Sequence, residues 1–200
     1  MQIGLLGSGQ VSQQLARHAV AAGHDILLSN RRGPASLAPL VAQLGPRARA
    51  VTPGEAAAAP LVILGVRWAD APTALAGLPP WNGRILVDPT NAFRDGGPAS
   101  GIVDTSPRAT SEVIAALAPG ARVVKALNTI YMTRFATPAI APGVRRVLFL
   151  SGDDADAKRT VANLLDSFGF ATVDLGDLHH GGLLQQVGGP LAGPDFHLAA

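Results

Sequence analysis

The stretch MQIGLLGSGQVSQQLARHAVAAGHDILLSNRR, residues 1–32, decides the fold. Its short apolar run from Gln2 to Leu6 predicts a strand that ends in Gly7-Ser8-Gly9. Gly7 suits a tight turn there, and Gly9 lets the backbone come close to a bound group. Small and apolar residues then recur at helical spacing, and Asp25 to Leu28 predicts a second strand. This order of strand, glycine turn, helix and strand predicts a dinucleotide-binding unit.

The glycine turn predicts where a diphosphate binds. The N–H groups in the first turn of the helix are free and face that position. We therefore expect cofactor contacts from Gly7, Ser8, Gly9, Gln10 and Val11. Ser12 stands where the third small residue of such a motif is usually Gly or Ala. Serine is still small enough for close packing of the helix; the alternative is a strand, turn and helix without a ligand.

The end of the second strand selects the dinucleotide. An NAD site needs an acidic residue there, roughly 20 residues past the glycines, to bind the ribose hydroxyls. This chain has Ser29-Asn30-Arg31-Arg32 instead, and its Asp25 lies at the opposite end of the strand. Two guanidiniums and a hydroxyl suit a 2′-phosphate, because planar guanidiniums bind phosphate oxygens in pairs. We expect NADP(H), with solvated loop charges as the alternative role of Arg31 and Arg32.

Strand and helix patterns continue to alternate along the chain, which predicts an α/β fold with a doubly wound, mostly parallel sheet. The expected strands are 47–51, 61–64, 84–87 and 122–124, and the expected helices are 35–44 and 53–59. A further strand, helix and strand at 144–150, 153–168 and 170–173 extend the same sheet. We expect a cofactor-binding domain over residues 1–176 and a short tail over 177–200. The segment 91–107 is expected to be a loop at the ligand-facing edge.

Composition excludes several classes of protein. Apolar residues make up 48% of the 200 residues and charged residues only 15%, as in sheets covered on both faces. The absence of cysteine excludes disulfides, thiolate metal sites and cysteine nucleophiles. A net charge of +2 with scattered basic residues argues against nucleic-acid binding. The sequence has no apolar run of about 18 residues and no signal-peptide pattern, so we expect a cytoplasmic protein without a membrane partner.

The tail contains three histidines, His179, His180 and His197, but lacks acidic or thiol partners at ligand spacing. We therefore expect no metal. The stretch 181–194 is expected to fold over the cofactor edge or to reach a second subunit. A short chain without a substrate domain gains a closed site by dimerising, so we expect a homodimer.

Several motifs taken together resemble the family of coenzyme F420-dependent NADP oxidoreductases, which includes NADPH-dependent F420 reductases. They are Gly7-Ser8-Gly9, Ser29-Asn30-Arg31-Arg32, Val66-Arg67-Trp68, the stretch 123–130 (VVKALNTI), 151–154 (SGDD) and 173–176 (VDLG). The resemblance covers roughly residues 1–178. It implies a Rossmann fold, NADP(H) binding and hydride transfer between nicotinamide and a deazaflavin (coenzyme F420) or flavin-like acceptor. It also places the 2′-phosphate against Ser29, Arg31 and Arg32, and Val66 beside the cofactor.

The chain departs from that family pattern in three places. Members from archaea have a long helical C-terminal segment that helps to shape the deazaflavin pocket, whereas here 24 residues follow Gly176. Arg67 stands where the family typically has proline, and Asn128 where it has histidine. The last two changes lie near the expected nicotinamide end. We expect Arg67 to bind an anionic acceptor or the cofactor diphosphate, with a surface salt bridge as the alternative.

Other side chains are expected at the nicotinamide end. Trp68 suits a stacking wall, or alternatively a place in the helix–sheet core. Asn91, Asn128 and Thr129 follow predicted strands, where amides suit the nicotinamide carboxamide or ribose; loop turns are the alternative. Lys125 is a proton donor in one hypothesis and a solvated strand-end lysine in the other.

Two classes of function remain at this stage. One is an NADPH-dependent oxidoreductase that passes hydride to a deazaflavin, a flavin or a small electrophile. Hydride transfer depends mainly on the positioning of two rings, so the sequence assigns no catalytic residue. The other is a non-catalytic NADP(H)-binding redox sensor that reports to a partner protein.

Overall fold

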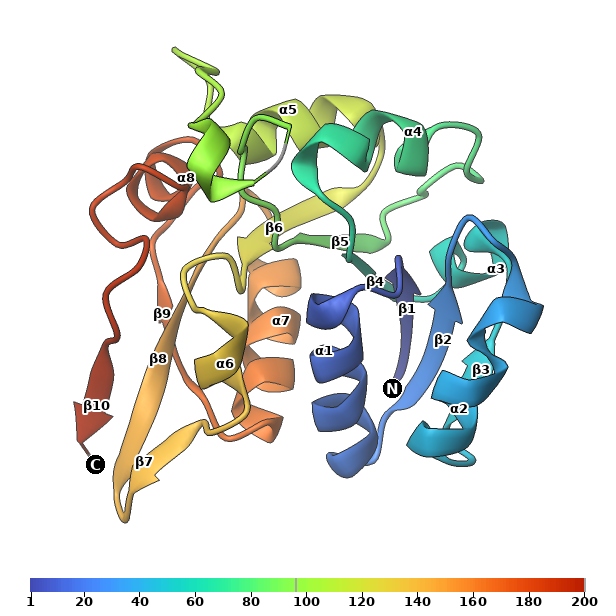
Figure 1. The fold of residues 1–200 in the computed structure, drawn as a ribbon. Helices are drawn as coiled ribbons and strands as arrows, with labels where there is room; N and C mark the ends of the chain where they lie inside the picture. Colours follow the sequence, from blue (N-terminus) through green and yellow to red (C-terminus); the bar gives the residue numbers. More distant parts are fainter. Residues whose placement is uncertain (96, 200) are drawn as a thin grey trace.

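The computed structural model describes residues 1–95 and 97–199. Within them the strands form one sheet in the order β10-β8-β6-β5-β4-β1-β2-β3, and β7 and β9 also pair with β8 (Figure 1). The strands are β1 (Gln2–Leu6), β2 (Asp25–Ser29), β3 (Ala48–Ala50), β4 (Leu61–Leu64), β5 (Ile85–Asp88), β6 (Arg122–Ala126), β7 (Ala139–Ala141), β8 (Val144–Ser151), β9 (Ala171–Asp174) and β10 (His197–Ala199).

The strands from β3 to β6 are all parallel, in the spatial order 3-2-1-4-5-6. This is the strand order of the Rossmann fold. In that fold, ligands bind beside β1 and β4, two neighbouring strands whose following connections run in opposite directions. β6 pairs antiparallel with β8, so the sheet is mixed at one side. The predicted doubly wound, mostly parallel α/β fold is confirmed.

Helices cover both faces of the sheet (Figure 1). One hydrophobic cluster joins a face of the sheet to α1 (Gln10–Ala21), α2 (Ala38–Leu44), α6 (Met132–Phe135) and α7 (Ala155–Ser167). A second cluster joins the other face to α3 (Pro53–Ala57), α4 (Ala71–Leu75) and α5 (Thr110–Leu117). The central strands are buried on both faces, which explains their uninterrupted apolar sequences. Short 3₁₀ turns η1 (Pro34–Leu37), η2 (Trp68–Asp70) and η3 (Pro98–Ser100) lie in the connections.

The predicted strands agree with the structure to within one or two residues, but one predicted helix differs. Residues 35–44 form η1 followed by α2, because Pro39 has no N–H to continue a helical hydrogen-bond ladder and begins a new helix instead. α7 begins after Asp154, whose carboxylate accepts a hydrogen bond from the Ala157 N–H (2.7 Å). The helices α4, α5, α6 and α8 (His180–Gln185) were not predicted.

The loops that follow β1 and β4 touch each other through their backbones. A Cβ atom placed on Gly7, whose φ is +111°, would lie 2.2 Å from the carbonyl oxygen of Gly65. A Cβ atom on Gly65 would lie 1.9 Å from Oγ of Ser12, which is fully buried. The prediction that Ser12 allows close packing of the first helix is therefore confirmed, and the same contact explains why residue 65 is a glycine.

The segment after residue 176 joins the rest of the fold. Its helix α8 (His180–Gln185) lies beside α5 and β8, and β10 pairs antiparallel with the first residues of β8. The division of the chain into 1–176 and 177–200 stays a prediction. Among the described residues, no helix combines the length and apolarity needed to cross a membrane.

Candidate functional site

Two neighbouring cavities open at the carboxyl ends of the parallel strands. One, of about 400 Å³, we call the basic cavity; it is lined by Gly7, Ser8, Ser29, Asn30, Arg31 and Arg32, among others. The other, of about 340 Å³, we call the aromatic cavity; it is lined by Gln10, Val11, Trp68, Asn91 and Phe93, among others. Gly9, Gly65, Val66 and Arg67 line both cavities. The two cavities therefore form one groove across the boundary between β1 and β4.

The glycine turn forms the floor of this groove. Gly9 is the N-cap of α1, and a Cβ atom on it would meet no other atom within 4 Å. The first backbone N–H of α1 that is bonded within the helix is that of Gln13, which donates to the Gly9 carbonyl (3.0 Å). The preceding N–H groups of the first turn remain available to an anion. The turn is therefore open on the side that faces the groove.

Asn30 organises the loop of the basic cavity. Its Nδ2 donates to Oγ of Ser8 (3.2 Å) and to Oγ of Ser36 (3.0 Å), and its Oδ1 accepts from the Arg32 backbone N–H (2.9 Å). These bonds join the loop after β2 to the glycine turn and fix its backbone. Asn30, predicted as a cofactor contact, thus shapes the loop that presents both arginines.

Ser29 lies deeper than expected from the sequence. It is 1% exposed, and its hydroxyl donates to the carbonyl of Leu5 (2.8 Å). The hydroxyl proton is therefore used within the sheet. The positive charge of the basic cavity comes instead from the exposed side chains of Arg31 and Arg32.

Arg67 stands between the two cavities and forms the salt bridge that was the alternative in the sequence. Its Nε lies 2.8 Å from Oδ2 of Asp70, and its side chain is 70% exposed. The hydrogen bond from Arg67 lowers the pKa of the Asp70 carboxyl, so that Asp70 is charged at neutral pH. An exposed pair of this kind contributes little to stability, so Arg67 is free to exchange partners.

The aromatic cavity has two aromatic walls. Trp68 packs against the second hydrophobic cluster, as in the core role considered for it, and also lines the cavity; its role as a stacking wall stays a prediction. Phe93 lies in the segment 91–107, where Val103 N–H donates to the Ala92 carbonyl (2.8 Å) and Phe93 pairs with Ile102. The segment predicted as a loop is thus partly paired with itself, and it does lie at this edge.

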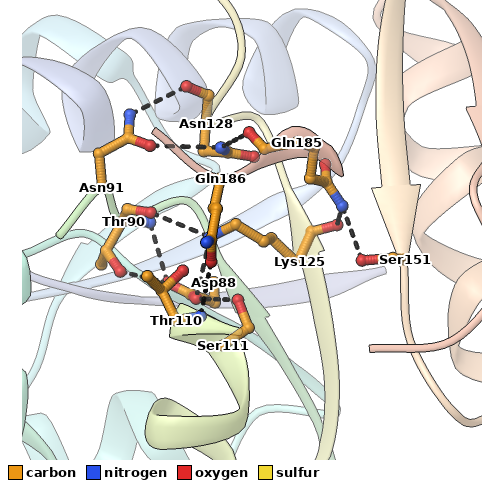
Figure 2. Close-up of polar contacts among 10 residues, drawn as sticks. All are labelled: Asp88, Thr90, Asn91, Thr110, Ser111, Lys125, Asn128, Ser151, Gln185 and Gln186. Carbon is orange, nitrogen blue, oxygen red and sulfur yellow. Dashed lines mark hydrogen bonds and ion pairs between the residues drawn. The ribbon is translucent and has the colours of Figure 1, made fainter. Parts of the chain in front are cut away.

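Behind the aromatic cavity lies a network of buried polar side chains (Figure 2). Lys125 is fully buried, and its Nζ lies 3.5 Å from Oδ2 of Asp88 on the neighbouring strand. The same carboxylate accepts hydrogen bonds from the Ser111 hydroxyl and from the N–H and hydroxyl of Thr90. The expectation of a solvated lysine is therefore wrong, because Asp88 supplies a buried counter-charge.

Lys125 does not reach either cavity. Burial lowers the pKa of its ammonium group, and the neighbouring Asp88 opposes that change. Its ammonium group instead contacts Asp88 and the carbonyl of Thr90.

Asn128 and Thr129 also line neither cavity. Both are 6% exposed, and Asn128 lies behind Asn91, to which it is hydrogen-bonded (Figure 2). Of the predicted nicotinamide contacts, the structure brings Arg67, Trp68 and Asn91 together in the lining of the aromatic cavity, which does not include Asn128 and Thr129.

Comparison with known proteins agrees with this arrangement. The model of the family "NADP oxidoreductase coenzyme F420-dependent" matches residues 2–92, which form most of both cavities. A structure assigned as an F420-dependent NADP reductase from Arthrobacter sp. FB24 is 28% identical, covers 89% of this chain and 86% of its own, and has a TM-score of 0.72. The chain belongs to this family of NADP-dependent oxidoreductases. The family resemblance found in the sequence is thereby confirmed.

Two other relatives extend over most of the chain. A hypothetical protein from Sinorhizobium meliloti is 37% identical with a TM-score of 0.90, and the match covers 98% of this chain and 95% of that one. Metalloreductase STEAP3 of Rattus norvegicus is 29% identical over 180 residues, which are 88% of this chain. The chain spans only about a third (34%) of the length of that curated relative.

The residues present fit the family's cofactor, NADP(H). The open space at Gly9 and the first turn of α1 suit a diphosphate, and the guanidiniums of Arg31 and Arg32 in the lining of the basic cavity suit a 2′-phosphate. Among the described residues, no cluster of histidine, aspartate and glutamate suits a metal ion. His179 is paired with Glu112 (2.8 Å) and His180 with Asp177 (2.8 Å).

Sequence reasoning missed several cavity residues: Gly65, Asp70, Thr90, Phe93 and Arg94. Gly65 and Thr90 follow the buried strands β4 and β5, so the rule that ligands bind beyond the carboxyl ends of strands indicates them. Asp70, Phe93 and Arg94 depend on loop geometry that no local pattern indicates.

The two glycines of the turn have separable roles. Gly7→Ala places a Cβ atom against the Gly65 carbonyl at a φ of +111°, so we expect a free energy of unfolding lower by more than about 2 kcal/mol. Gly9→Ala meets no atom, and we expect a loss of under about 1 kcal/mol. We expect the Gly9→Ala methyl group to weaken NADPH binding at least tenfold. Urea unfolding and calorimetric titration of both variants test this; equal stability losses would contradict it.

The chain has two lysines, Lys125 and Lys158, so the same substitution at Lys158 serves as a control for the buried ion pair of Lys125. Lys125→Met leaves the Asp88 carboxylate buried without its counter-charge, so we expect a loss of about 3–5 kcal/mol in the free energy of unfolding. Lys158 pairs with the half-exposed Asp174 (3.0 Å) and donates to the Gly176 carbonyl (3.0 Å), and we expect Lys158→Met to cost less than about 2 kcal/mol. Chemical unfolding of the two variants measures both losses. A Lys125→Met variant as stable as Lys158→Met would refute the buried ion pair.

Proposed function

We propose that this protein is an NADPH-dependent reductase that binds the adenosine end of its cofactor in the basic cavity and the nicotinamide end in the aromatic cavity. The observation that carries the proposal is the continuity of the two cavities through Gly9, Gly65, Val66 and Arg67. A dinucleotide has two ends joined by a diphosphate, and this groove has two ends joined at a helix N-terminus. Bound NADPH supplies a hydride at the nicotinamide ring.

Preference for NADPH over NADH follows from the charges of the basic cavity. Arg31 and Arg32 line it, and Arg67 lies at its border with the aromatic cavity. Asp70 is the acidic residue in its lining, and its charge is paired with Arg67. A guanidinium pair at the end of β2 favours a 2′-phosphate dianion, whereas a ribose hydroxyl gains little there.

The acceptor is proposed to be a flat, conjugated molecule, that is a deazaflavin, a flavin or a small electrophile such as a quinone or an imine. Trp68 and Phe93 provide aromatic walls for a ring, and Asn91 provides a polar group in the same lining. Arg67, Arg94 and Asp95 line the same cavity, and the excess of one positive charge favours an acceptor with negative charge. The acceptor gains the hydride and then takes a proton from solvent, so the protein's part is to hold two rings at reacting distance.

The test of the cofactor is a calorimetric titration with NADPH and NADH. We expect wild-type protein to bind NADPH at least tenfold more tightly, a difference of roughly 1.4 kcal/mol. In the Arg31→Ala, Arg32→Ala double variant we expect this preference to disappear, with the affinity for NADH changed less than about twofold. The Arg47→Ala, Arg49→Ala variant removes the same charge from exposed side chains outside both cavities and serves as the control. Equal affinities of wild-type protein for both nucleotides would refute the assignment.

Turnover distinguishes a reductase from a redox sensor. NADPH oxidation is followed by its absorbance with coenzyme F420, a flavin mononucleotide, a quinone or a cyclic imine added. A reductase oxidises NADPH faster with at least one of these acceptors than with none. If the protein binds NADPH but accelerates its oxidation with none of these acceptors, the site is better explained as that of a redox sensor.

A further inference from the structure

Asn91 in the wall of the aromatic cavity is held from behind by Asn128. Nδ2 of Asn91 donates to the carbonyl oxygen of Asn128 (3.0 Å), and Nδ2 of Asn128 donates to Oδ1 of Asn91 (3.3 Å). Figure 2 shows this reciprocal pair between the loops that follow β5 and β6. Asn128 is 6% exposed, so the pair is shielded from water on that side.

The two amide groups have only one consistent orientation. Asn128 Nδ2 also donates to the main-chain carbonyl of Gln185 in α8 (2.6 Å), and Asn91 Nδ2 donates to a main-chain carbonyl as well. A carbonyl oxygen only accepts, so the nitrogen must face it in both residues. Asn91 is left with one N–H and part of its oxygen's accepting capacity for a ligand in the cavity.

The backbone before Asn128 is strained. Leu127 has a φ of +71°, a region that side chains with a Cβ rarely occupy, and it is 3% exposed. Such conformations persist where the surrounding structure enforces them, and they occur frequently at functional sites. Here the left-handed residue directs the chain at the end of β6 so that Asn128 reaches both Asn91 and Gln185.

Helix α8 is itself held in place by hydrogen bonds to Ser151 and Thr110. The side-chain amide of Gln185 is fully buried and hydrogen-bonds the Ser151 hydroxyl (2.7 Å). The side-chain oxygen Oε1 of Gln186 accepts a hydrogen bond from the Thr110 N–H (2.8 Å). The carbonyl of Gln185 is therefore a rigid acceptor for Asn128. The wall residue before Asn91 is held in the same way, because Lys125 Nζ donates to the carbonyl of Thr90 (3.1 Å).

We propose that Asn128 is a positioning residue for the nicotinamide end of the groove, acting through Asn91 and anchored by α8. It does not touch the cofactor; it orients the amide of Asn91 toward the nicotinamide carboxamide. The proposal rests on the proposed function, since it takes the aromatic cavity as the nicotinamide site. The C-terminal segment then contributes to the site without lining it.

The test compares two ligands on Asn128→Ala. Adenosine 2′,5′-bisphosphate has the adenosine end of NADPH and no nicotinamide. We expect Asn128→Ala to lower the affinity for NADPH about fivefold or more, which is the effect of one lost hydrogen bond. We expect its affinity for the bisphosphate to stay within about twofold of the wild-type value. The exposed Asn163→Ala on α7 is the matched control and changes neither affinity. Thermal unfolding of each variant shows that it is folded at the temperature of the titration.

A double variant separates positioning from direct contact. If Asn128 acts through Asn91, then adding Asn128→Ala to Asn91→Ala changes the NADPH affinity no further. The same loss in both backgrounds would show direct contact and overturn the proposal. An equal loss for NADPH and bisphosphate would show a general structural role and overturn it too.

Two further results keep the inference separate from the proposed function. Wild-type protein that binds neither ligand refutes the proposed function, and the inference with it. Wild-type protein that binds both, with Asn128→Ala indistinguishable from wild type, refutes the inference alone. If Asn128→Ala does not fold, Asn128→Ser takes its place, because a single short hydroxyl does not bridge Asn91 and Gln185.

Discussion

The backbones of Gly7 and Gly65 approach each other so closely that no side chain fits between them. β1 and β4 are neighbours in the sheet, but the chain leaves them in opposite directions, toward α1 on one face and toward η2 and α4 on the other. Ser12 fills the remaining space under α1. The first turn of α1 therefore lies at the floor of the groove, where the two cavities meet. On the other face of β1, a Cβ atom on Gly4 would lie 2.0 Å from the Ala56 carbonyl, so α3 is equally close.

The second constraint is the burial of charge at the ends of β5 and β6. A buried ion pair recovers its desolvation cost only if hydrogen bonds satisfy its remaining atoms. Asp88 accepts from Thr90 and Ser111 as well as from Lys125, and Lys125 donates to the Thr90 carbonyl. The buried ion pair therefore contributes less to the free energy of folding than to the fixed geometry of the loops around it. It fixes the backbone of the loop that forms one wall of the aromatic cavity.

The sequence predicts most of the framework, because its signals are local. Apolar runs mark β1 and β4 to the residue, and the glycine turn and Arg31-Arg32 indicate the groove and its charge. What it does not predict depends on contacts between distant segments. Lys125 looks like a solvated lysine until β5 places Asp88 beside it. Asn128 looks like a ligand contact until the φ of Leu127 and the carbonyl of Gln185 turn it behind Asn91.

Because Asn91 is held through Asn128 by α8, the two parts of the groove are completed at different stages of synthesis. The basic cavity is built from residues 6–74, whereas the anchor of Asn128 lies at Gln185. During synthesis from the N-terminus, the strands and helices around the basic cavity leave the ribosome first. All residues of the basic cavity are thus synthesised well before Gln185, whose carbonyl anchors Asn128. The contacts that hold Asn91 in place are therefore among the last in this groove to become possible during synthesis.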